Sequence, residues 1–167
     1  MHSVSRNLLQ VHLYVMAFGM DQPVKDADIA GLWARFVRVG QSVLAAVEGD
    51  LKAAGFPPLA WYDALLELRR GAPDGLRQFE LQGHMLLAQY NMSRLIDRLV
   101  DAGYARRQPC PEDGRGQVVY LTEKGRALID AMWPAYRAAI SAHFGDRLDE
   151  RQVEALSEIL ETLRSAR

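Results

Sequence analysis

The chain has 167 residues, of which 49% are hydrophobic and 25% are charged, and its net charge at pH 7 is -1. This length and balance are typical of one folded globular unit and exclude a disordered chain or a polycation. The single cysteine, Cys110, excludes an intrachain disulfide framework and a cysteine-rich zinc site, which fits a reducing cytoplasm.

Residues 1–23 resemble a secretory signal only weakly, because polar side chains interrupt the apolar stretch from Leu8 to Phe18. We expect either an N-terminal extension that packs on the rest of the protein or a native start at Met20, with a secretory signal as the alternative. No stretch approaches the roughly 18 apolar residues of a membrane-spanning helix, so we expect no membrane partner.

The next segments carry helical signals. Apolar residues recur at helical spacing from Val24 to Ala54, which predicts one helix of roughly 30 residues, ended by Gly55 and two prolines. A second helix is predicted over Leu59–Arg70, before a stretch of glycine, proline and aspartate. Two short helices are predicted to follow, over roughly Gln78–Met85 and Gln89–Ala102.

Residues 104–109 and 117–122 are predicted to form two strands joined by a glycine-containing loop, which makes a β-hairpin. Thr122 is expected to cap a long helix, in which Pro134 predicts a kink. Asp149 is expected to cap a last helix.

The order of these elements predicts a mainly α protein with a small β-hairpin wing, namely a winged helix-turn-helix with long N- and C-terminal helices. The apolar stripes of the long helices are too extended for the small module to cover, so we expect them to pack on each other and on a second subunit. The predicted divisions are an extension over 1–23, dimerisation helices over 24–55 and 123–167, and a DNA-binding module over 56–122.

The second short helix has two faces. Its apolar stripe consists of Met92, Leu95, Ile96 and Leu99. The side chains of its first turns and outer face are polar or aromatic: Gln89, Tyr90, Asn91, Ser93, Arg94 and Arg98. Gln and Asn can pair with adenine, and Arg with guanine or a phosphate, so this face has the chemistry of a helix that reads the major groove. The alternative is the solvated face of a core helix.

The hairpin adds a second set of cations. Arg106 and Arg107, in its first strand, are expected to contact phosphates, and Arg115 follows Asp113 by two residues in a loop with glycines. A narrow minor groove attracts an inserted arginine, and Asp113 is close enough to orient the Arg115 guanidinium. Residues 69–127 hold ten Lys and Arg against seven acids, a net +3 against -4 for the rest, which favours an anion-facing surface. The alternative is an exposed Asp-Gly turn with an incidental arginine.

Three motifs point to a known family: "RLIDRL" followed by a glycine, the Asp-x-Arg loop at Asp113 and Arg115, and "LTEKG" at 121–125. Over roughly Leu59–Asp130 the chain resembles the multiple-antibiotic-resistance regulator (MarR) family of bacterial transcription factors. The order of the predicted helices extends this resemblance over most of Val24–Arg164.

The resemblance implies a two-fold dimer on a palindromic operator, with Gln89–Asp101 in the major groove and Arg115 in the minor groove. It also implies a repressor that a small aromatic or phenolic effector releases from DNA. The chain departs from the family at Leu86, where a turn Gly or Asn is usual, and at Ala88, where a Ser cap is usual, so we expect a weakened helix start. Tyr90 is bulkier than the usual small hydroxyl residue.

Six side chains could form an effector pocket between the long helices and the DNA-binding module, with ordinary core packing as the alternative. They are Trp33, Phe36, Trp61, Tyr62, His84 and Met85. The four histidines lack metal-ligand spacing, so no metal site is expected. Cys110 is expected to be a small exposed residue of the wing.

No catalytic residue and no cofactor are predicted, because the sequence has no phosphate-binding glycine loop, nucleophile elbow or paired-carboxylate arrangement. The sequence therefore predicts a cytoplasmic, homodimeric regulator whose partners are double-stranded DNA, a second copy of itself and a small aromatic effector. The alternative is a helical dimeric adaptor that binds small molecules or proteins but not DNA, which the near-neutral charge and the residues Leu86 and Ala88 motivate.

Overall fold

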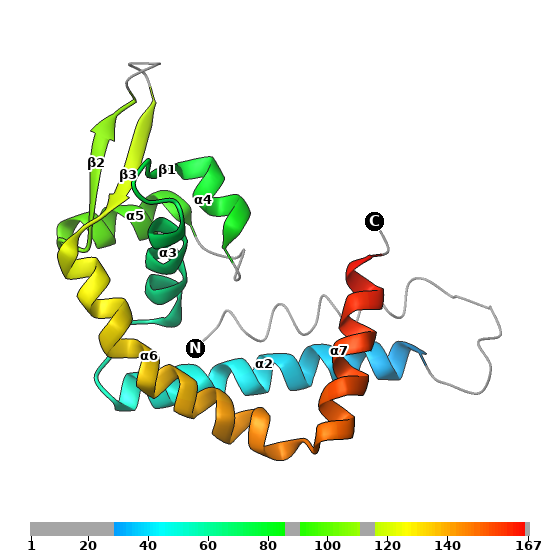
Figure 1. The fold of residues 1–167 in the computed structure, drawn as a ribbon. Coiled ribbons are helices and arrows are strands. Elements are labelled where there is room, and N and C mark those ends of the chain that lie inside the picture. Colours follow the sequence, from blue (N-terminus) through cyan, green and yellow to red (C-terminus); the bar gives the residue numbers. More distant parts are fainter. Residues whose placement is uncertain (1–28, 86–90, 111–115, 166–167) are drawn as a thin grey trace. The chain divides into compact units, whose positions relative to one another are not determined.

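The computed structural model describes residues 29–85, 91–110 and 116–165 (Figure 1). The chain divides into two units, 1–42 and 43–167, and each is described by itself. The predicted extension over 1–23 lies outside the described residues.

The described chain is mostly helical, with one small sheet. In chain order the elements are α2 (Ile29–Ala53), α3 (Leu59–Arg70), β1 (Leu76–Arg77), α4 (Gln78–His84), α5 (Met92–Asp101), β2 (Ala105–Pro109), β3 (Gln117–Leu121), α6 (Glu123–His143), the 3-10 helix η1 (Gly145–Arg147) and α7 (Glu150–Arg164). The predicted fold class, a mainly α chain with a hairpin wing, is confirmed.

Glycine and proline set the helix boundaries as expected. After α2 the chain turns at Gly55, whose φ of 81° suits a residue without a side chain. Helix α3 has the predicted bounds, and its C-cap is Gly71. Helix α5 ends in a Schellman-type pattern, since the Tyr104 N–H donates to the Leu99 carbonyl (2.9 Å) and the Gly103 N–H to the Val100 carbonyl (2.8 Å).

The sheet has three antiparallel strands in the order β1-β3-β2. The predicted hairpin is confirmed, with Ala105 opposite Leu121 and Pro109 opposite Gln117. In Figure 1 this hairpin extends away from the short helices. Strand β1 was not predicted, because two residues are too few to show an alternating pattern.

One core holds the winged module together. Helix α3 packs against α4, α5, β3 and α6. The largest fully buried side chains come from all of these elements and from the end of α2: Leu51, Leu65, Leu68, Leu81, Ile96, Leu99, Val119, Ile129 and Met132. Because burial of such side chains is the dominant stabilising term, α5 and the hairpin are fixed to one scaffold.

The two C-terminal helices begin at the predicted caps. The Thr122 Oγ1 accepts the Gly125 N–H at the start of α6 (3.1 Å), and the Asp149 Oδ1 accepts the Gln152 N–H at the start of α7 (2.9 Å). Helix α6 continues through Pro134 as one element, and the predicted kink stays a prediction. None of the 15 residues of α7 is buried within the chain.

Candidate nucleic-acid interface

Helix α5 presents a polar face to solvent. Met92, Leu95, Ile96 and Leu99 are buried, as the spacing predicted. Asn91, Ser93, Arg94 and Arg98 are exposed. Because the four apolar anchors fix the rotation of the helix, the exposed side chains keep a defined direction.

The start of α5 differs from the expectation. The Asn91 Oδ1 accepts the Arg94 N–H at 3.2 Å, so Asn91 is the N-cap of the helix. The expected weak start rested on Ala88 as the cap position and is wrong for α5, because the helix begins at Met92 and its first turn is capped. Ala88, Leu86, Gln89 and Tyr90 lie outside the described residues.

A neighbouring helix supports Ser93. The Gln78 Nε2, in the first turn of α4, donates to the Ser93 Oγ at 3.0 Å. Both residues are exposed, so this bond lies on the same surface as the polar face of α5. Gln78 was not among the predicted DNA-contacting residues, which all came from the second short helix and the hairpin. A polar residue in the first turn of the preceding helix was the available signal.

The two arginines of β2 are held in different ways. The Arg107 Nη1 lies 2.6 Å from the Asp97 Oδ1 of α5. The Arg106 guanidinium lies over the Tyr120 ring of β3, 4.4 Å from its centroid. Arg106 is exposed and can turn to a phosphate, whereas Arg107 would first have to leave Asp97. Phosphate contact by either residue stays a prediction.

The wing tip is bracketed by described residues. The Cys110 N–H donates to the Gly116 carbonyl at 2.8 Å, which closes the hairpin on both sides of residues 111–115. Asp113 and Arg115 themselves lie outside the described residues, so the minor-groove contact stays a prediction.

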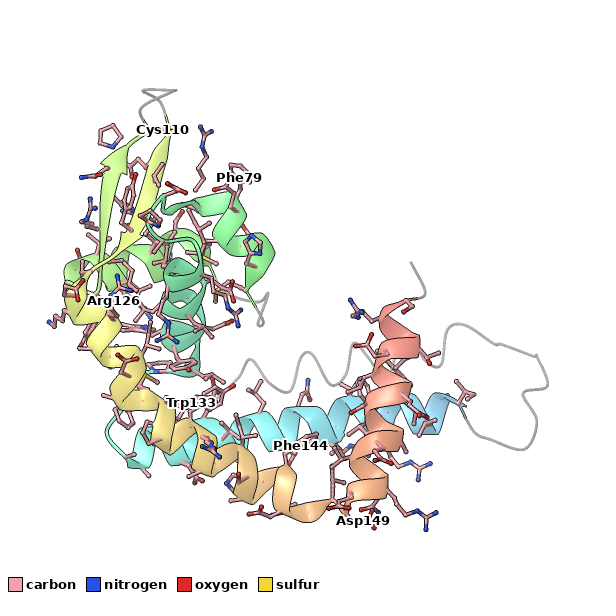
Figure 2. All side chains as sticks on the ribbon, in the orientation of Figure 1. Phe79, Cys110, Arg126, Trp133, Phe144 and Asp149 are labelled. Carbon is pink, nitrogen blue, oxygen red and sulfur yellow. The ribbon has the colours of Figure 1, made fainter. Side chains whose placement is uncertain are left out.

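Cys110 is not the exposed loop residue that the sequence indicated. Its side chain is 5% exposed, and the Arg77 Nη2 donates to its Sγ at 3.0 Å. Figure 2 labels Cys110 at the end of the described part of the hairpin. Arg77 immediately precedes α4, so the burial of Cys110 depends on an element 33 residues away in sequence.

The six predicted effector-pocket residues have unlike surroundings. Trp33 and Phe36 are exposed on the part of α2 that belongs to residues 1–42, with ring centroids 6.0 Å apart. Among residues 43–167, Tyr62 and Met85 are buried, Trp61 is half-buried and His84 is exposed. Two surface hollows, of about 190 and 470 Å³, lie beside the sheet, and none of the six residues lines either one. The effector pocket therefore stays a prediction.

Among residues 29–85, 91–110 and 116–165, no group of three or more His, Cys, Asp or Glu side chains could hold a metal ion. Within the same ranges, no helix combines the length and the apolar character needed to cross a membrane.

Comparison with known proteins gives consistent results. The MarR family model matches residues 54–116. The HTH-type transcriptional regulator YkoM of Bacillus subtilis is 32% identical over 123 residues, which are 72% of this chain and 77% of YkoM. An HTH-type transcriptional regulator of Bacillus cereus is 33% identical over 101 residues, 60% of this chain, and the match spans only 65% of that relative's length.

The solved structures agree with the fold. Sco3205 of Streptomyces coelicolor, a MarR family transcriptional regulator crystallised with DNA, is 26% identical, with a TM-score of 0.72 over 86% of this chain and 91% of Sco3205. The proteins to which the chain is similar are transcriptional regulators and not enzymes. The match of the MarR family model and the match to YkoM, which spans more than two thirds of both chains, show that this chain belongs to the MarR family of transcriptional regulators.

Proposed function

We propose that this protein binds a palindromic DNA operator as a homodimer and controls transcription of neighbouring genes. The observation that carries the proposal is the two-faced α5, with exposed Ser93, Arg94 and Arg98 opposite four buried apolar side chains. Sco3205, which shares the fold, was crystallised with DNA.

The first turns of α5 supply the proposed base contacts. A recognition helix enters the major groove with its N-terminal residues. Arg94 is an exposed cation there, beside Ser93, and can pair with the O6 and N7 of guanine or with a phosphate. Asn91 uses its side-chain oxygen as the helix cap, which leaves its amide N–H groups as donors toward DNA.

The hairpin supplies the proposed second contact. Strands β2 and β3 pair as the two arms of the hairpin, and Arg115, in the segment that joins them, would reach the minor groove, oriented by Asp113. Arg106 would contact phosphates, since its guanidinium is exposed beside Tyr120. These contacts would fix the register of α5 on the duplex.

Helix α7 supports the dimer. Its apolar side chains follow one stripe, in which Leu156 is half-buried and four others are exposed: Val153, Ile159, Leu160 and Leu163. An isolated helix of 15 residues is marginal in water, so its stability requires that this stripe be buried. A second copy, related by a two-fold axis, covers the stripe and places two α5 helices on two half-sites of a palindrome.

A small aromatic effector that releases the DNA would make the protein a repressor. The resemblance to the family supports this part, and Trp33, Phe36, Trp61, Tyr62, His84 and Met85 remain its proposed contacts. A change in tryptophan fluorescence with phenolic compounds, paralleled by release of the operator, tests it. The proposed release would be contradicted if none of the compounds that bind the protein changed its affinity for the operator.

The direct test is selection of operators from fragmented genomic DNA, followed by gel-shift titration. We expect the selected operator to be a palindrome. The logarithm of the affinity should fall by about 0.9 per phosphate contact for each tenfold rise in salt concentration. Arg94→Ala should lose about 1–3 kcal/mol of binding free energy. Arg151→Ala on α7 is the control, since it removes an exposed arginine away from α5. No retention of DNA at low salt would indicate the adaptor instead.

A further inference from the structure

The C-terminal end of α5 is tied to the start of α6 through three consecutive carbonyl groups. The Ala102 carbonyl accepts from the Lys124 Nζ (2.8 Å) and the Gly103 carbonyl from the Thr122 Oγ1 (2.8 Å). The Tyr104 carbonyl accepts from the Thr122 N–H (3.2 Å). The Ala102 carbonyl belongs to the C-cap of α5 and has no partner within the helix, so Lys124 satisfies a group that otherwise needs water. The Gly103 and Tyr104 carbonyls follow the helix, and Thr122 satisfies both of them. We call this group of contacts the α5–α6 clasp.

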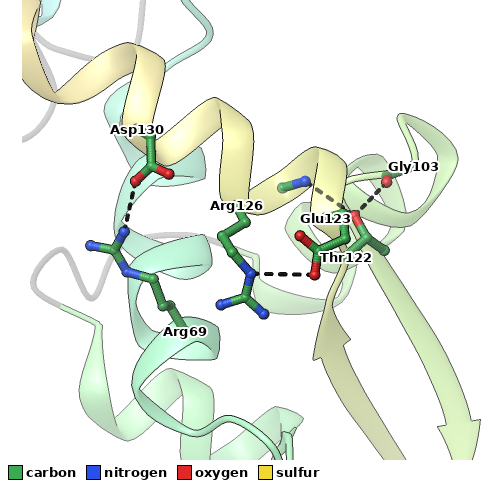
Figure 3. Close-up of polar contacts among 7 residues, drawn as sticks. Arg69, Gly103, Thr122, Glu123, Arg126 and Asp130 are labelled. Atoms are coloured by element: carbon green, nitrogen blue, oxygen red, sulfur yellow. Dashed lines mark hydrogen bonds and ion pairs between the residues drawn. The ribbon is translucent and has the colours of Figure 1, made fainter.

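The Thr122 hydroxyl serves both helices at once. It donates to the Gly103 carbonyl after α5 and accepts the Gly125 N–H in the first turn of α6, at 3.1 Å (Figure 3). One oxygen atom therefore joins the C-terminal end of one helix to the N-terminal end of the other. A change in their relative position breaks at least one of these two bonds.

Lys124 extends the clasp to α3. Its ammonium nitrogen lies 4.7 Å from the centroid of the Tyr104 ring, and that ring meets Trp61 of α3 edge to face, with centroids 5.8 Å apart. A cation at a helix C-terminus also interacts favourably with the helix dipole. Lys124 thus joins α5, the turn after it and, through Tyr104, α3.

We propose that Thr122 and Lys124 are positioning residues that set the angle at which α5 meets DNA. Helix α5 has 10 residues and is therefore about 15 Å long, and the clasp lies at the end opposite Arg94. A tilt of roughly 10° about the clasped end moves the first turn by about 2.5 Å, which is enough to break a hydrogen bond to a base. The inference rests on the proposed DNA binding.

Lys124→Met tests the clasp, because methionine keeps an unbranched apolar stem over Tyr104 and loses the ammonium. We expect its operator affinity to fall at least about fivefold, the loss of one charge-assisted hydrogen bond. Its affinity for non-specific DNA and the slope of affinity against salt should stay unchanged. Lys124→Arg, which keeps a cationic donor, should restore operator affinity to within about twofold. Lys52→Met, at the end of α2, is the matched control for loss of a lysine charge.

Two results would overturn the inference. One is wild-type operator affinity in Lys124→Met. The other is an equal loss on operator and non-specific DNA with a salt slope smaller by about 0.9, which would make Lys124 a direct phosphate contact.

Hydrogen exchange tests the clasp without DNA. Lys124→Met and Thr122→Val should exchange the amides of residues 98–104 faster than the wild type, with α3 unchanged. Unchanged exchange in both variants overturns the clasp. If the wild-type protein selects no operator, the proposed function fails, and this exchange result still decides the clasp.

Discussion

Tyr62 and Tyr136 meet edge to face between α3 and α6, with ring centroids 5.1 Å apart. Burial raises the pKa of Tyr62 above its ordinary value, where Arg69 lowers it and Asp130 raises it to smaller extents. Burial also raises the pKa of Tyr136, and Asp63 adds to that effect. The fold therefore favours the protonated form of both phenols.

Alkaline pH should lower the free energy of unfolding through the ionisation of this tyrosine pair. In the unfolded chain a tyrosine loses its proton near pH 10, before the folded phenols do. The stabilisation is therefore complete below about pH 10 and is lost as the pH rises through the raised folded values. Urea titrations at several pH values should show the free energy of unfolding falling above pH 10. The double variant Tyr62→Phe, Tyr136→Phe should fall less steeply, and an equally steep fall would refute this origin.

For Cys110 and Arg107, the surroundings in the structure differ from those expected from the sequence. Each has a partner on another element, Arg77 before α4 for Cys110 and Asp97 of α5 for Arg107. The Arg107–Asp97 pair is partly exposed, so it contributes little to stability and can exchange for a phosphate contact.

At the level of elements, Gly125 explains why the "LTEKG" segment ends in glycine. A Cβ at this position would lie 2.2 Å from the Tyr104 carbonyl oxygen and 2.7 Å from the Leu121 Cδ1. The first turn of α6 therefore approaches the backbone after α5 more closely than any side chain allows. This close approach is what lets Thr122 and Lys124 reach the carbonyls of the clasp.

Gly125→Ala should lower the free energy of unfolding by about 2 kcal/mol or more, because the added methyl group meets backbone that cannot move aside. Gly83→Ala is the control, since Gly83 is also a helical glycine and, among the described residues outside its own helix backbone, no atom lies within 4 Å of its added Cβ. That change should raise stability by about 0.5–1 kcal/mol through the lost flexibility of glycine. Equal effects of the two substitutions in urea unfolding would contradict the close approach.

At the level of the whole molecule, exposed apolar side chains of the C-terminal helices support the proposed dimer. Besides the stripe of α7, Trp133 and Phe144 of the α6 region are 46% and 44% exposed (Figure 2). Exposed large apolar side chains that gather on a surface are typical of an interface between subunits. Dimerisation and operator binding should therefore fail together.

Ile159→Asp should convert the proposed dimer to a monomer, since it would place an unpaired charge in the stripe that a second copy is proposed to cover, at a cost of about 2–4 kcal/mol. Sedimentation at micromolar concentration measures the mass, and gel shift should show the operator affinity falling with it. Thr162→Asp adds the same charge outside the stripe and should remain dimeric. A dimeric Ile159→Asp protein would place the interface elsewhere.

The order and bounds of most elements followed from the sequence. The spacing of apolar residues, Gly55 and the caps Thr122 and Asp149 predicted helices and hairpin close to where they lie, and α3 at its observed bounds. These signals act within a few residues of chain, so no knowledge of distant contacts is needed to interpret them. The buried stripe of α5 was predictable for the same reason.

The sequence by itself determined the element order, the two faces of α5 and the resemblance to a family of regulators. Only the tertiary structure decided that β1 exists, that Cys110 is buried under Arg77, and that Thr122 and Lys124 hold the end of α5. Strand β1 is two residues long and is defined by its pairing with β3. Such features depend on groups far apart in the chain, and the free energy of a contact arises only when the fold brings both partners together.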